Sequence, residues 1–117
     1  MARACSPNNP MNESFAVVLV TVPDIETGRR LARVALESRS AACVNLVPGI
    51  ESHYWWEGKL DKSSEVLLVI KTTREKLAEL EKQVVGNHPY DTPEFVVLPI
   101  TQGTERYLKW LAGSVSG

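Results

Sequence analysis

The fold of this 117-residue chain is decided by the stretch FAVVLVTV, residues Phe15–Val22. It is a short, nearly continuous run of apolar side chains, many of them β-branched, which is typical of a buried strand. Pro23 ends the run, and Asp24 is a suitable N-cap for a helix over residues 25–38. A strand followed by a helix is therefore predicted.

A long β-hairpin is predicted next, over residues 41–71, bent near Pro48-Gly49 and turned at Glu57-Gly58. Near its tip lie two adjacent tryptophans, Trp55 and Trp56, which a domain this small cannot cover. Exposed aromatic side chains on a long strand edge indicate that something packs against the hairpin.

The remaining elements complete a recognisable order. Thr72 and Glu75 match a capping box, and the helix that they begin is expected to end at Gly86. Residues 95–100 (FVVLPI) are typical of a fourth strand, in which Pro99 marks an edge or a bulge because it cannot donate a hydrogen bond. Thr104 then caps a C-terminal helix.

This order, β-α-β-β-α-β with a further helix, predicts an α+β fold: a ferredoxin-like sandwich with a long hairpin between its second and third strands. We expect a disordered tail over residues 1–13, one domain over residues 14–113, and a short tail over residues 114–117. The strands scarcely alternate between apolar and polar side chains, whereas the strands of a sheet with one solvent-exposed face should alternate. The side of the sheet opposite the two helices is therefore expected to be buried as well. Another copy of the chain is the simplest way to bury it, so a homo-oligomer is predicted.

Composition excludes several classes of protein. The chain has 13 Lys+Arg and 14 Asp+Glu, which argues against a nucleic-acid or anionic-membrane surface. No apolar run approaches the roughly 20 residues of a membrane helix. The two cysteines, Cys5 and Cys43, are too few for a disulfide scaffold, so a reducing compartment is expected.

The loop of residues 87–94 (NHPYDTPE) is the first candidate site, because two prolines stiffen a backbone that carries a histidine, a tyrosine and two carboxylates. The alternative is an ordinary connection that follows a helix cap. His88 and Glu94 could meet across the loop as metal ligands, and a neighbouring subunit could supply others. His53 fits a surface or subunit contact, and Cys43 fits a small buried residue.

No catalytic residue is predicted. Cys43 has no base partner that the sequence identifies, the serines have no motif around them, and the isolated glycines form no phosphate-binding loop. Three arginines on the first helix, at positions 29, 30 and 33, suggest either an anion site or a solvated face. We therefore expect a protein that is not an enzyme and has no organic cofactor.

Six short motifs fall in an order and spacing that resemble the CutA divalent-cation tolerance family. The resemblance covers about residues 15–113. The motifs are AACVN (residues 41–45), YWWEGK (54–59), IKTT (70–73), HPYDTPE (88–94), LPI (98–100) and YLKW (107–110).

The resemblance implies a homotrimer of ferredoxin-like protomers, similar in plan to the PII signalling proteins. It implies a cytoplasmic role in tolerance of divalent metals, copper above all, and leaves a protein partner open. By likeness to PII proteins, clefts between subunits near Trp56, Lys71, Tyr90 and Tyr107 would bind a small molecule, such as a small anion or a metabolite, or a protein partner.

The resemblance also implies a metal-ligand set, which this sequence matches in part. The family's late first-strand cysteine corresponds to Val20, and the first of its paired histidines corresponds to Asn87. His88 and Glu94 match. Because sulfur and one imidazole are missing, the expected ion is Cu(II), weakly bound by imidazole and carboxylate.

Overall fold

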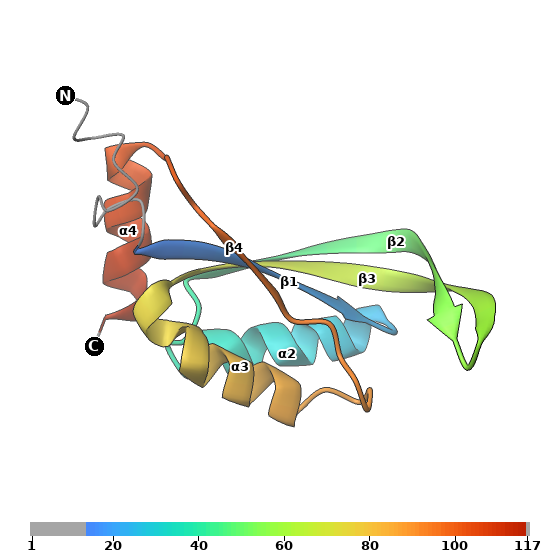
Figure 1. The fold of residues 1–117 in the computed structure, drawn as a ribbon. Helices are drawn as coiled ribbons and strands as arrows, with labels where there is room; N and C mark the ends of the chain where they lie inside the picture. Colours follow the sequence, from blue (N-terminus) through green and yellow to red (C-terminus); the bar gives the residue numbers. More distant parts are fainter. Residues whose placement is uncertain (1–13, 117) are drawn as a thin grey trace.

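The computed structural model describes residues 14–116; the predicted disordered tail over residues 1–13, with Cys5, lies outside them. The elements follow the predicted order (Figure 1). They are β1 (Phe15–Val22), α2 (Ile25–Glu37), β2 (Cys43–Trp56), β3 (Lys59–Thr73), the 3-10 helix η2 (Arg74–Lys76), α3 (Leu77–Gly86), β4 (Val96–Pro99) and α4 (Glu105–Val115). The strands form one antiparallel sheet in the order β2-β3-β1-β4, which confirms the ferredoxin-like α+β fold.

The core lies between the sheet and the two helices α2 and α3, which cover the same face (Figure 1). Alternate residues of β1, including Val18 and Val20, point into this core and are fully buried. Leu68 and Ile70 of β3 join them. Gly28 lets α2 approach closely, since a Cβ there would lie 3.2 Å from a methyl carbon of Leu68. From Ala16 to Val22, every second residue of β1 is buried, and this alternation fixes the register of the sheet.

The hairpin of β2 and β3 projects beyond the rest of the sheet (Figure 1), as its long arms predict. The register shifts between Val47 and Ile50, where Gly49 has a φ of +76°, so the predicted bend is confirmed. The tip is a two-residue turn in which Glu57 and Gly58 both have positive φ, 51° and 78°. This backbone suits the twist of a tight hairpin.

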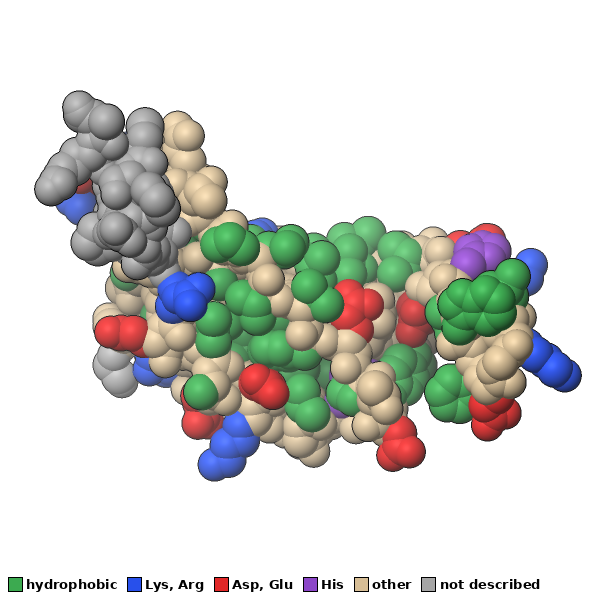
Figure 2. Space-filling model, viewed as in Figure 1, with side chains coloured by type: hydrophobic (Ala, Val, Ile, Leu, Met, Phe, Trp, Pro, Cys, Tyr) green, Lys and Arg blue, Asp and Glu red, His purple; other side chains and the backbone are tan. Residues whose placement is uncertain are grey.

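The opposite side of the sheet, which we call the outer sheet face, carries the other parity of side chains. It includes Val17, Leu19, Leu67, Val69 and Leu98. Helix α4 covers only one end of it, where Leu108 and Leu111 pack against Phe15. Leu98 on the edge strand β4 is 46% exposed, and Figure 2 shows hydrophobic side chains gathered over this region.

Three details differ from the sequence-based expectations. The predicted capping box is wrong: Thr72 is buried in β3, and its hydroxyl donates to the carbonyl oxygen of Ser40 at 2.6 Å. A buried hydroxyl needs such a partner, which outweighs a local cap. Helix α3 ends at Gly86 as predicted, but Asn87 is its C-cap residue. Helix α4 continues past residue 113 to Val115, which is buried.

The predicted helix caps at Asp24 and Thr104 and the edge position of Pro99 are confirmed. The Asp24 carboxylate accepts from the Thr27 amide at 2.8 Å, and Thr104 accepts from the Tyr107 amide at 3.4 Å. Pro99 lies on β4, an edge strand of the sheet. No helix within residues 14–116 is both long and apolar enough to cross a membrane.

Candidate functional site

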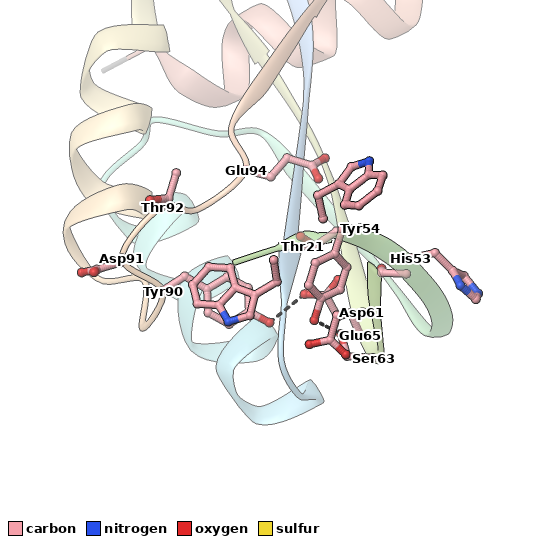
Figure 3. Close-up of a pocket in the computed structure, with 13 residues that line it drawn as sticks. Thr21, His53, Tyr54, Asp61, Ser63, Glu65, Tyr90, Asp91, Thr92 and Glu94 are labelled. Carbon is pink, nitrogen blue, oxygen red and sulfur yellow. Dashed lines mark hydrogen bonds between the residues drawn. The ribbon is translucent and has the colours of Figure 1, made fainter. Parts of the chain in front are cut away.

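A cleft of about 830 Å³ lies between the hairpin and the loop that joins α3 to β4 (Figure 3). We call it the hairpin cleft. Its volume is in the range of small-molecule sites. Its lining comes from the end of β1, from both hairpin strands and from the loop, and consists of Thr21, Ser52, His53, Tyr54, Trp55, Trp56, Asp61, Ser63, Glu65, Tyr90, Asp91, Thr92 and Glu94.

His88 anchors the loop to β1 instead of lining the cleft. Its Nε2 lies 2.8 Å from the carbonyl oxygen of Thr21, and its Nδ1 lies 3.0 Å from the amide nitrogen of Tyr90. A carbonyl only accepts and an amide only donates, so the imidazole carries its proton on Nε2 and accepts at Nδ1. Both ring nitrogens are therefore engaged, and the ring of Tyr90 packs 4.7 Å away.

Tyr90 connects this anchor to a buried carboxylate. Its hydroxyl donates to Oε2 of Glu65 at 2.6 Å, drawn as a dashed line in Figure 3. Glu65 is only 8% exposed, although it belongs to a polar stretch of the hairpin. Burial and the contact with Glu65 both raise the pKa of Tyr90, so the phenol stays protonated and remains a donor.

The cleft is acidic. Four acidic residues line it, Asp61, Glu65, Asp91 and Glu94, and the lining contains no lysine or arginine. Desolvation, and then the charge of Glu65, raise the pKa of Glu94. In Figure 3, Glu94 lies on the same side of the loop as Tyr54 and Glu65, whereas Asp91 points away.

The six residues singled out from the sequence fall in two places. Trp56, Tyr90 and Glu94 line the hairpin cleft, and His88 supports it from behind. Lys71 and Tyr107 lie at the other end of the sheet.

The separation follows from the register of β3. Lys71 pairs with Cys43, whereas Lys59 pairs with Trp56 at the hairpin tip. At about 3.3 Å per residue the two pairs are roughly 40 Å apart along the strand. Lys71 donates to the side-chain oxygen of Asn45. One protomer therefore does not form a single site from Lys71, Tyr107 and the cleft residues.

The described residues do not form a metal centre within one protomer. Residues 14–116 contain no group of three or more His, Cys, Asp or Glu side chains placed to hold an ion. His53 is among the residues that line the cleft, and its ring pairs with Glu51 at 2.6 Å on the exposed hairpin surface. Cys43 is half-buried, with its sulfur 3.8 Å from Asn45. Metal binding by His88 and Glu94 stays a prediction.

Sequence reasoning missed Glu65, the most buried carboxylate of the cleft. It ends the polar run KSSE, which is typical of a solvated hairpin arm. One signal was available: Glu65 shares the parity of Leu67 and Val69, and these face the outer side of the sheet. Its burial depends on Tyr90, which comes from a loop 25 residues away.

The sheet order, the projecting hairpin and the acidic cleft at its base define a class of protein: ferredoxin-like α+β proteins with an extended second hairpin. Comparison with protein families narrows this class. The model described as CutA1 divalent ion tolerance protein matches residues 16–114. The chain belongs to this family.

Individual relatives agree. A divalent-cation tolerance protein CutA from Thermus thermophilus is 47% identical over 95 residues, which are 81% of this chain and 92% of that protein. The crystal structure of CutA1 from Oryza sativa has a TM-score of 0.85 at 50% identity and covers 89% of this chain and 95% of that one.

Plant relatives are longer. A chloroplastic CutA protein from Arabidopsis thaliana is 53% identical over 98 residues, which are 84% of this chain and 54% of that protein. The chain thus spans about half the length of the plant proteins that it matches.

Proposed function

We propose that this chain acts in divalent-cation tolerance as a cytoplasmic, non-enzymatic homotrimer. The family and the names of its bacterial members support the tolerance role. The main observation that supports assembly is the outer sheet face, where apolar side chains such as Val96 and Leu98 are exposed in the protomer. Apolar patches of this kind mark contact surfaces.

The hairpin supports the same proposal. Trp55 is 72% exposed and Leu60, its pairing partner, is equally exposed. Side chains of this size gain from burial at roughly 25 cal/mol per Å² of apolar surface. We propose that each hairpin packs along a neighbouring protomer, which buries both residues and covers a strand edge.

For the metal, we propose weak binding of Cu(II) by Glu94 and His88, with further ligands from a neighbouring protomer. Carboxylate oxygen and imidazole nitrogen both suit this ion. His88 becomes a ligand only when one ring nitrogen releases Thr21 or Tyr90, its present partners. The loss of that hydrogen bond keeps the affinity low.

Calorimetric titration of the tag-free protein with Cu(II), Zn(II) and Ni(II) tests this site. We expect saturable Cu(II) binding with a dissociation constant below about 1 mM. Glu94→Ala and His88→Ala should each abolish Cu(II) binding. Each protomer contributes only these two ligands to the proposed site, so either substitution leaves a single ligand.

His53→Ala is the matched control, since it removes the other histidine, which pairs with Glu51 outside this loop. It should leave Cu(II) binding unchanged. The metal proposal fails if no ion binds saturably, or if the control abolishes binding while the two loop variants retain it.

A second function is favoured by the hairpin cleft itself. We propose that the cleft, completed between protomers, binds a small molecule or a protein partner, as a PII-like regulatory module would. Its volume, about 830 Å³, and its aromatic lining support this use. Lys71 and Tyr107 contribute only when a neighbouring protomer brings them to Trp56 and Tyr90.

A further inference from the structure

Glu65 is a buried carboxylate that has no cationic partner in its own protomer, as far as residues 14–116 describe it. The residue is 8% exposed, and its Oε2 accepts from the hydroxyl of Tyr90. Neither ion pair within residues 14–116 involves it. Glu65 lies on the outer sheet face, because it shares the parity of Leu67 and Val69 on β3. A buried carboxylate is normally paired with a positive charge.

Lys71 is a basic residue on the same face of the same strand. It is half-buried, and its ammonium donates to the side-chain oxygen of Asn45. An ammonium has three N–H donors, and neither ion pair among the described residues includes Lys71. Glu65 and Lys71 are six residues apart in β3, or about 20 Å at about 3.3 Å per residue. They therefore cannot pair with each other within one protomer.

The face between these two charges is apolar. Leu67 and Val69 occupy the intervening positions of β3, and Val17 and Leu19 of β1 pair beside them. When a second copy covers this face, both charges lose water while the apolar side chains are buried. An unpaired charge in such an interface is strongly destabilising. Each charge therefore needs an opposite charge on the neighbouring protomer.

We propose that Glu65 of each protomer forms an ion pair with Lys71 of the partner subunit. In a ring of identical chains each interface joins two different patches of the chain. The Glu65 end of one outer sheet face can thus meet the Lys71 end of the next, and the pair recurs at every interface. It also supplies a cation to the hairpin cleft, whose lining has no lysine or arginine. This inference rests on the proposed assembly through the outer sheet face.

Charge reversal tests the ion pair. Glu65→Lys and Lys71→Glu each place like charges at the contact, so each should reduce the mass in light scattering from that of the trimer to that of one chain. The double variant Glu65→Lys/Lys71→Glu restores opposite charges across the interface and should recover the mass of the trimer. Because the two residues are about 20 Å apart in one chain, recovery reports a contact between protomers.

Lys59 provides the matched control. It has the same parity on β3 as Lys71, but it is exposed beside the hairpin turn, where it pairs with Trp56. The variant Glu65→Lys/Lys59→Glu has the same composition as the double variant above and should remain dissociated. If it recovers the mass of the trimer while Glu65→Lys/Lys71→Glu does not, the assignment of Lys71 is wrong.

Neutral substitutions repeat the test without placing a lysine beside Tyr90. Glu65→Gln keeps an oxygen that accepts from the Tyr90 hydroxyl, and Lys71→Met removes the other charge. Each should lower the urea midpoint of unfolding at a fixed protomer concentration, because it leaves one buried charge unpaired. The variant with both changes should lose less than the sum of the two losses. Strictly additive losses, as expected for residues without contact, would contradict the pair.

The mass of the wild-type protein separates the two levels of the proposal. A wild-type particle with the mass of one chain overturns the assembly and the ion pair together. A wild-type trimer whose Glu65→Lys and Lys71→Glu variants both remain trimers overturns the ion pair alone and leaves the assembly standing.

Discussion

Leu98→Glu should convert the proposed trimer into monomers. Leu98 lies on the outer sheet face, paired with Val17, and is half-exposed in the protomer. In an assembly that covers this face, the substitution would bury one carboxylate per protomer against apolar neighbours. Each unpaired buried charge costs several kcal/mol, which is enough to abolish association at micromolar concentration.

The control for this experiment is Val85→Glu. Val85 is an exposed apolar residue of similar size, but it lies on α3, the helix that packs against the opposite face of the sheet. This variant introduces the same charge without touching the outer sheet face, so it should keep the wild-type mass. If Leu98→Glu also keeps the wild-type mass, the protomers associate through a surface other than the outer sheet face.

His88→Ala should lower the free energy of unfolding by about 2 kcal/mol. The imidazole satisfies the carbonyl of Thr21 and the amide of Tyr90, and each unmade hydrogen bond costs about 1 kcal/mol. The loss should concentrate in the loop and loosen the contact of Tyr90 with Glu65. Denaturant unfolding at a fixed protomer concentration measures the total, since the stability of an oligomer depends on concentration.

His53→Ala serves as the comparison within the same chain. Its imidazole lies on the hairpin surface, where it pairs with the exposed carboxylate of Glu51. Exposed ion pairs contribute little, so the change should stay within about 0.5 kcal/mol. Hydrogen exchange of the Tyr90 amide should accelerate in His88→Ala alone. Equal stability of the two variants would show that the anchor does not hold the loop.

Much of the fold could be predicted because local signals and burial agree. The strand of residues 15–22 has the predicted bounds, and the hairpin turns at Glu57-Gly58 as its sequence indicates. Thr72 shows the limit of local reasoning. Its spacing to Glu75 matches a helix capping box. In the folded protein, however, its hydroxyl donates to the carbonyl oxygen of Ser40, and strand β3 continues to Thr73.

The candidate site was less predictable because its residues are assembled by long-range contacts. The loop of residues 87–94 was identified from its composition, but composition could not show that His88 faces inwards to Thr21. Nor could it show that Tyr90 reaches Glu65. Lys71 was grouped with Trp56 through a family resemblance, and the register of β3 separates them within one protomer.

Assembly is the claim on which the metal site and the shared cleft both depend. Light scattering coupled to size-exclusion chromatography, at micromolar protomer concentration, measures it most directly. We predict a particle with three times the 13.0 kDa mass of the chain. A stable particle of 13.0 kDa would contradict the account, because the outer sheet face would then remain exposed to water.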